Sequence, residues 1–127
     1  MLYFNPVRIF KTRNFHKWAT REGLDDNRLK AAVSEVQSGL VDASLGGQLY
    51  KKRVPIPGRG KRGGTRTILA IASGKRAFFV YGFSKNARSN ISSEELQALK
   101  LLARELLGYR CNTIDKALHA GTLIEVN

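Results

Sequence analysis

The sequence predicts a single α+β domain in which a short strand and a helical hairpin precede a three-stranded antiparallel sheet and a C-terminal helix. Three observations support this prediction. The chain has 127 residues, the length of one ordinary domain. Apolar residues recur with helical spacing near 25–40 and 92–107. Three runs between residues 48 and 83 have the composition of strands.

The first third of the chain predicts a strand followed by two helices. Residues 7–10 alternate along the chain and form the short strand. Asn14 is placed to cap a brief helix that ends at Gly23, and Asp25 or Asp26 opens the second helix. The apolar positions of this second helix follow the helical repeat: Leu29, Ala32, Val33, Val36 and Leu40.

The middle of the chain predicts three strands over residues 48–54, 65–72 and 76–83. Residues 73–74 are Ser-Gly, so we expect a tight turn and an antiparallel hairpin between the last two strands. The segment 55–64 joins the first two strands and is rich in proline and glycine. Proline stiffens its start, and glycine lets its backbone approach a ligand closely.

The last predicted helix begins at Ser92. Ser92 and Glu95 form an S-x-x-E capping box, and a broad leucine stripe behind them is expected to face the core. A further turn of helix and a short strand are expected after this helix. We therefore divide the chain into a main domain, 1–108, and a C-terminal appendage of the same domain, 109–127.

Positive charge is concentrated in this middle region. Lys and Arg number 22 against 10 Asp and Glu, which gives a net charge of +12. No carboxylate lies between Asp42 and Glu94. That interval holds half of all the basic residues: Lys51, Lys52, Arg53, Arg59, Lys61, Arg62, Arg66, Lys75, Arg76, Lys85 and Arg88. Such a one-signed segment favours a polyanionic partner, above all a nucleic acid.

The remaining composition predicts a soluble cytoplasmic protein with no membrane partner. Cys111 is alone, so an intramolecular disulfide is impossible and a reducing compartment is compatible. The N-terminus lacks the apolar run of a signal peptide, and no stretch approaches the ~20 apolar residues of a membrane span.

The sequence does not match the well-known motifs of dinucleotide-binding, metal-binding or hydrolytic sites. The glycines of the segment 58–63 match G-x-G-x-x-G, but a strand follows them instead of the helix that dinucleotide binding requires. His16 and His119 lie far apart in the sequence, with no acid at metal-ligand spacing. No Ser-His-Asp set, Cys-His pair or carboxylate pair falls in a site-like segment. We expect no metal and no cofactor.

Lysine, arginine, tyrosine and backbone amides are the reactive groups left in the basic segment. They suit phosphoryl chemistry in which RNA supplies the nucleophile through its 2′-hydroxyl. Arginine offers a phosphate two parallel hydrogen bonds, and a lysine crowded by other cations can exchange a proton near neutral pH. Lys51, Lys52 and Arg53 would crowd Arg66 if their strands pair. The residues thus predict nucleic-acid contact and permit cleavage.

Three segments together resemble the RelE/ParE toxin superfamily, most closely its HigB-like branch. They are Leu49-Tyr-Lys-Lys-Arg-Val54, Gly58-Arg-Gly-Lys-Arg-Gly-Gly-Thr-Arg66 and Phe78-Phe-Val-Tyr-Gly-Phe-Ser-Lys-Asn86. The resemblance covers roughly residues 5–107 and implies a RelE-like fold. It implies a toxin of a bacterial type II toxin–antitoxin system that cleaves mRNA on the ribosome without a metal ion. It also implies a co-encoded antitoxin as partner, in the HigB branch often a helix-turn-helix protein.

The resemblance further implies roles for four catalytic residues. Lys51 and Arg53 match basic residues of the family that act in proton transfer and phosphate binding. Arg66 matches an arginine that stabilises transition-state charge, and Lys85 matches a basic residue just after the last strand.

Six other residues are expected to hold RNA: Lys52, Arg59, Lys61, Arg62, Tyr81 and Arg88. The best-known ribonucleases of the family carry an arginine and a tyrosine where this chain has Asn86 and Ser92. Tyr81 is the candidate replacement for that tyrosine, from a different strand.

Two alternatives stay open at this stage. A ParE-like member would poison a DNA topoisomerase by binding it, although that branch tends to lack the catalytic bases. A non-catalytic module would bind RNA or DNA with strong salt dependence and leave the strand uncut.

Overall fold

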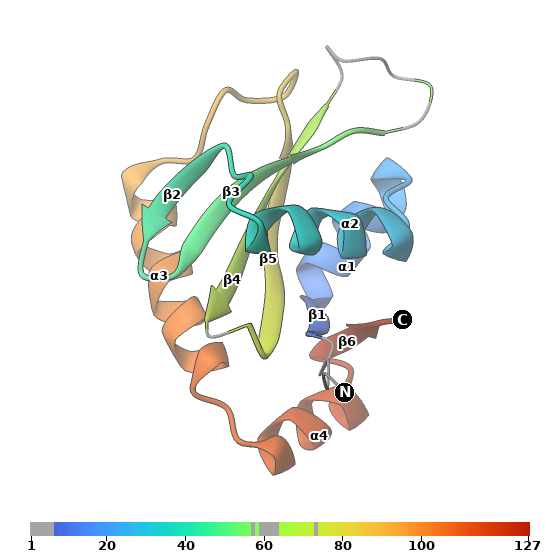
Figure 1. Ribbon diagram of the computed structural model, residues 1–127, viewed down its shortest axis with the longest axis vertical. Helices are drawn as coiled ribbons and strands as arrows, with labels where there is room; N and C mark the ends of the chain where they lie inside the picture. The colour runs from blue at the N-terminus through green and yellow to red at the C-terminus, as the bar shows by residue number, and fades with distance from the viewer. Residues whose placement is uncertain (1–6, 57, 59–63, 73) are drawn as a thin grey trace.

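The computed structural model describes residues 7–56, 58, 64–72 and 74–127. Within them the chain forms one six-stranded sheet and four helices (Figure 1). The strands are β1 (Arg8–Thr12), β2 (Ala43–Gly46), β3 (Leu49–Val54), β4 (Thr65–Ala72), β5 (Arg76–Ser84) and β6 (Leu123–Val126). The helices are α1 (Arg13–Glu22), α2 (Asp26–Gln37), α3 (Ser93–Leu107) and α4 (Cys111–Ala120). The α+β prediction is confirmed.

The sheet has the order β2-β3-β4-β5-β1-β6 and is larger than the sequence predicts. The three predicted antiparallel strands, β3 to β5, lie at its centre. β1 joins them in parallel with β5, and β2 and β6 form the two edges. β2 is the strand that the sequence does not predict, because Ala43–Gly46 lacks the β-branched and aromatic residues typical of strands. Gly46, Gly47 and Gln48 turn it into β3 with positive φ angles of 83°, 61° and 65°.

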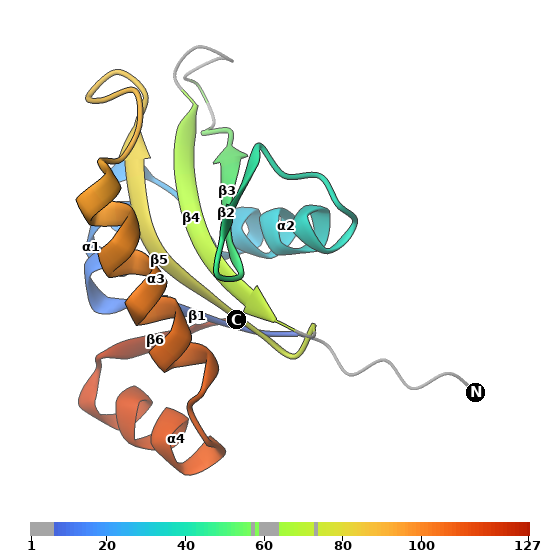
Figure 2. The same ribbon diagram turned by 90° about the vertical axis from the view of Figure 1, so that its left-hand side faces the viewer.

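Separate core clusters lie on the two faces of the sheet. On one face, beneath α1 and α2, Phe15 stacks on Phe79 with ring centroids 5.1 Å apart. On the other face, beneath α3 and α4, Phe10 stacks on Phe78 at 5.2 Å. The side view shows α2 and α3 on opposite sides of the central strands (Figure 2). We call these the α2 face and the α3 face.

Side-chain caps explain where the helices begin. Asp25 caps α2, and Ser92 and Glu95 form the predicted capping box of α3. The prediction of Asn14 as the cap of α1 is wrong. Thr12, the last residue of β1, accepts from the Phe15 N–H instead, so strand and helix follow each other without a linker.

One apolar residue of the predicted second helix is exposed, and so is one leucine outside the predicted stripe of the last helix. Leu40 follows the helical spacing of the sequence but is 60% exposed, because α2 ends at Gln37. Leu101 of α3 is 69% exposed. The other predicted apolar positions of α2 are buried: Leu29, Ala32, Val33 and Val36.

Residues 109–127 extend the sheet. Their helix, α4, spans ten residues, where the sequence predicts a single turn. β6 pairs antiparallel with β1, and Arg13 donates to the carbonyls of Ala120 and Gly121 at 2.9 Å each. The division of the chain at residue 108 stays a prediction. Among the helices described, none is both long and apolar enough to span a bilayer.

Candidate nucleic-acid interface

Strands β3 and β4 present three of the predicted catalytic cations on one face of the sheet. Arg53 lies opposite Arg66, and Lys51 lies opposite Ile68. Directly opposed residues in antiparallel strands point to the same face, as do residues two apart on one strand. Ile68 belongs to the core cluster of the α3 face. Lys51, Arg53 and Arg66 therefore share the α3 face, at the end of the sheet where the β3–β4 connection lies.

Arg66 is half-buried and only partly satisfied. Its side chain is 16% exposed, and its Nε lies 3.8 Å from Asp42 Oδ2. Its Nη1 is buried and has no hydrogen-bond partner among the described residues. Burying a charged donor without a partner is costly, and a phosphate oxygen is a natural acceptor for it. Arg66 is thus suited to bind an anion.

Gly64 gives the two arginines room at the end of this hairpin. A Cβ at residue 64 would stand 3.0 Å from Arg53 Nε and 3.7 Å from Arg66 Nη1. Both guanidinium groups therefore lie close to one point. Two cations this close repel each other, and an anion placed between them would remove that repulsion. The pair is a candidate phosphate clamp.

Lys51 is the candidate for proton exchange. Its side chain is half-buried on the α3 face, two residues along β3 from Arg53. Within the described part of the chain no hydrogen bond or ion pair engages its ammonium group. A lysine held near two arginines without its own carboxylate remains available to a substrate.

Tyr81 lines the same face from β5, opposite Ile68. Its hydroxyl accepts a hydrogen bond from Arg88 Nη1 at 3.1 Å and donates to Glu95 Oε2 at 3.3 Å. Arg88 also forms a bidentate pair with Glu95, the capping-box residue of α3. The Arg88 guanidinium, with the Ser92 backbone N–H, lowers the pKa of Glu95 to about 2. Arg88 therefore links Tyr81 to the start of α3, and its contact with RNA stays a prediction.

The structure does not bring Lys52 together with these residues. Lys52 points to the α2 face, where its ammonium lies 2.9 Å from the Leu40 carbonyl and 3.1 Å from Glu35 Oε2. Strand alternation accounts for this, since Lys51 and Lys52 are neighbours on one strand. The geometry gives Lys52 a role in fixing the end of α2 against β3.

The other predicted contacts lie around the same end of the sheet or outside the described residues. Lys85 is exposed and directly follows β5, whose last residue, Ser84, pairs with Thr65 of β4. The segment after β5 and the facing ends of β3 and β4 lie at one end of the molecule in both views (Figures 1 and 2). Arg59, Lys61 and Arg62 lie outside the described residues.

Two acidic residues of this region are not predicted from the sequence as site residues. Asp42 lies beside Arg66 because its own backbone N–H bonds to the Lys51 carbonyl at 2.9 Å, which aligns it with β3. Glu95 is predicted only as a helix cap. In the sequence both residues lie at the ends of the acid-free interval. Asp42 is its first boundary, and Glu95 directly follows Glu94, its second. Within the described residues, no group of three or more His, Cys, Asp or Glu is arranged to hold a metal ion.

Fold and site together define a class: a small basic α+β protein whose central antiparallel strands carry lysine and arginine on one face. The chain belongs to the RelE family, because the family model described as the RelE toxin of the RelE / RelB toxin–antitoxin system matches residues 7–126. The protein is therefore a toxin of a toxin–antitoxin system, and a cognate antitoxin is its partner. A search of curated proteins returned no match. The predicted superfamily is confirmed, and the HigB-like branch stays a prediction.

Proposed function

We propose that this toxin is an endoribonuclease that cleaves mRNA on the ribosome. One observation carries the proposal: Lys51, Arg53 and Arg66 share one face of the β3–β4 pair, where a buried Arg66 nitrogen has no partner among the described residues. Family membership supports it, since it makes the chain a toxin. The acid-free interval around these residues supports a polyanionic substrate.

The proposed reaction uses the nucleophile that RNA already carries. The 2′-oxygen forms a bond to the adjacent phosphorus as the bond to the 5′-oxygen breaks, which yields a 2′,3′-cyclic phosphate and a 5′-hydroxyl. One proton leaves the 2′-hydroxyl, and one is taken up by the departing 5′-oxygen. The protein must align the strand, neutralise charge at phosphorus and exchange these protons.

We assign charge neutralisation to Arg53 and Arg66. Guanidinium groups bind two phosphate oxygens at once and do not lose their proton. Proton exchange is assigned to Lys51, whose ammonium has no partner among the described residues. Tyr81, held by Arg88 and Glu95, is proposed to contact a base next to the reacting phosphate. Arg88 acts through Tyr81 in this proposal.

Lys85, at the same end of the sheet, is proposed to bind the neighbouring phosphate. The glycine-rich segment is proposed to hold the RNA backbone through Arg59, Lys61 and Arg62, on the strength of its charge alone. RNA contact is not proposed for Lys52, whose ammonium is held at the end of α2. The antitoxin partner is proposed to be a helix-turn-helix protein, as in the HigB-like branch.

Induced expression in bacteria tests this proposal. Wild type should arrest growth and fragment cellular mRNA, and Arg66→Ala should do neither. Lys30→Ala serves as the matched control, since Lys30 is exposed on α2 and loses one positive charge in the same way. Growth and intact mRNA with all three proteins would contradict a nuclease.

The two alternatives give different outcomes in the same experiment. Arrest with intact mRNA and a DNA-damage response would indicate a ParE-like topoisomerase inhibitor. Harmless expression together with salt-sensitive binding of uncut RNA would indicate a binding module.

A further inference from the structure

β5 has an unpaired edge beyond the end of β1. Their parallel pairing runs from Arg8–Arg76 to Lys11–Phe79, and the chain then leaves the sheet to enter α1. Residues 80–84 of β5 pair with β4 on one side and with no described strand on the other. This stretch is about 17 Å long, and its outward backbone groups can accept an added strand. The Ser84 carbonyl is the exception, because it already accepts from the Ala87 and Arg88 N–H groups.

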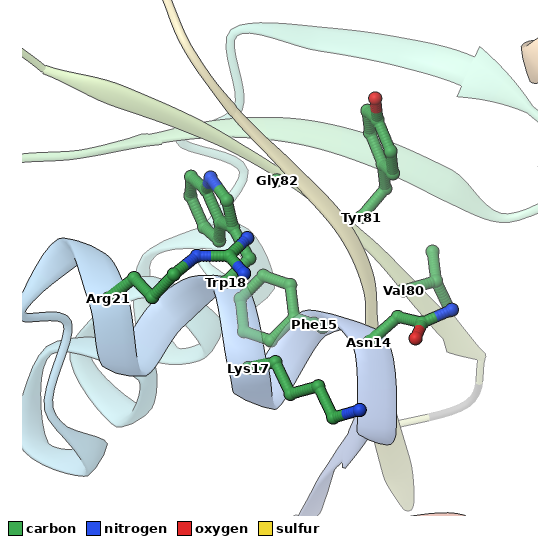
Figure 3. A pocket seen from close by; sticks show the side chains of 8 residues that line it. All are labelled: Asn14, Phe15, Lys17, Trp18, Arg21, Val80, Tyr81 and Gly82. Atoms are coloured by element: carbon green, nitrogen blue, oxygen red, sulfur yellow. The ribbon is translucent and has the colours of Figure 1, made fainter.

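A hollow lies on each side of this edge, and the two meet where β1 ends. The first measures about 340 Å³ and lies between α1 and β5 (Figure 3). The second measures about 360 Å³ and lies toward α3 and β6. Asn14 and Val80 line both of them. An extended segment along residues 80–84 would therefore have a hollow on either side.

The two hollows differ in chemistry. Lys17 and Arg21 line the first, are both exposed, and have no ion-pair partner within the described residues. The indole of Trp18 also lines it and lies against the backbone of Gly82 (Figure 3). Three leucines line the second hollow, Leu102, Leu106 and Leu123, and Arg13 lines it too. The Arg13 guanidinium is already bonded to the carbonyls of Ala120 and Gly121. The first hollow thus offers two cations without an ion-pair partner among the described residues, and the second offers three leucines.

We propose that the β5 edge at residues 80–84 is the docking site for an extended segment of the antitoxin in which acidic and apolar residues alternate. Side chains of a strand point alternately to its two sides, so one set of an added strand would meet Lys17 and Arg21 and the other the leucines. Main-chain hydrogen bonds to β5 supply the register.

Charge selects the antitoxin over another copy of this chain. A net charge of +12 makes two copies repel each other, and Lys17 and Arg21 would face each other across such a contact. An acidic segment gains from the same charges. RNA could use the cations but has no counterpart for the strand edge or the leucine hollow. The inference rests on the antitoxin that family membership implies and not on the proposed cleavage of RNA.

An NMR titration of the full-length, ¹⁵N-labelled chain tests the proposal. The probe is the peptide acetyl-Asp-Leu-Asp-Val-Asp-Leu-Asp-amide, added to millimolar concentration. The amides of residues 80–84 should shift, and their hydrogen exchange should slow, because they gain a partner strand. The peptide with lysine in place of each aspartate should leave them unchanged. Absence of any shift with the acidic peptide overturns the proposal.

Charge variants locate the contact. The double variant K17E/R21E should bind the peptide at least about tenfold more weakly than wild type, because two ion pairs at the rim are lost. The control K30E/K116E changes the net charge equally at two exposed lysines that line neither hollow, and should bind as wild type does. Equal weakening in both doubles would show a non-specific charge effect and overturn the site. Displacement of the peptide from residues 80–84 by hexauridylate RNA would assign the edge to nucleic acid instead.

Discussion

Arg53 and Arg66 lie directly opposite each other on β3 and β4, and no side chain at Gly64 separates their guanidinium groups. Like charges at directly opposed positions of a sheet destabilise it, whereas opposite charges there are favourable. In this protein the cost is offset in part by Asp42, 3.8 Å from Arg66 Nε. An arrangement that is costly in the free protein and relieved by an anion is the physical basis of the proposed phosphate clamp.

Filling the space at Gly64 should disturb the clamp without unfolding the protein. A Cβ would stand 3.0 Å from Arg53 Nε, which is flexible enough to move away. We expect Gly64→Ala to reduce RNA cleavage slightly and Gly64→Val to reduce it about tenfold or more. The free energy of unfolding, measured with urea, should change by less than about 0.5 kcal/mol in both variants. Full activity of Gly64→Val would show that the position of Arg53 does not matter.

Replacing Asp42 by Asn should separate RNA binding from RNA cleavage. The amide keeps an oxygen beside Arg66 but loses the negative charge that attracts the guanidinium, so Arg66 is held less firmly. The change also removes a negative charge beside the proposed phosphate. The cleavage rate should fall about tenfold while RNA affinity stays equal or rises. Single-turnover kinetics measure both. Asp115→Asn, at an exposed residue of α4, is the control for the charge change, and an equal effect there would count against a positioning role.

The Arg88–Glu95 pair should make stability depend on pH in acid. The pKa of Glu95 is lowered from its ordinary 4.5 to about 2 in the folded chain, chiefly by Arg88. A carboxyl with a lowered folded pKa stabilises the protein above its unfolded pKa, and that contribution is lost as pH falls from about 4.5 to about 2. The free energy of unfolding, measured with urea, should fall across this interval more steeply for wild type than for Glu95→Gln. Parallel curves would contradict the pair.

Gly82 should be intolerant of any side chain because Trp18 lies against it. A Cβ at residue 82 would come within 2.1 Å of the Trp18 ring. Gly82→Ala should lower the free energy of unfolding by about 1–3 kcal/mol, as overpacking does. The cost of Gly82→Ala should be smaller in a Trp18→Ala background, which a double-mutant cycle followed by circular dichroism measures. Equal costs in the two backgrounds would mean that the ring does not press on residue 82.

Local signals in the sequence predict most of the central fold. The capping box at Ser92 and the strand-like runs around Arg66 depend on neighbours in the chain, so they can be recognised without the structure. The parallel pairing of β1 with β5 joins residues far apart in sequence, and β2 has no strand-like composition of its own. Neither could be predicted from local patterns.

In the candidate site, too, local sequence predicts some features, and contacts between distant residues determine the others. Lys51, Arg53 and Arg66 share a face because strands alternate, which the sequence already indicates once the strands are paired. Alternation also places Lys52 on the other face, but its contacts with Glu35 and Leu40 depend on where α2 ends. The engagement of Arg88 with Glu95 depends on how the chain returns from β5 to α3. Charge alone could not distinguish the cations that hold carboxylates or carbonyls of the chain from those without such a partner among the described residues.

The most direct test of the central claim is cleavage of an mRNA with a single altered sugar on purified ribosomes. The cleavage position is first mapped with unmodified mRNA, and the nucleotide on its 5′ side is then replaced by its 2′-deoxy form. The account predicts that wild type cuts the unmodified mRNA to a 2′,3′-cyclic phosphate and leaves the 2′-deoxy mRNA intact at that position. Arg66→Ala should cut neither mRNA. Equal cleavage of the two mRNAs would contradict it, because the nucleophile would then not be the 2′-hydroxyl of the RNA.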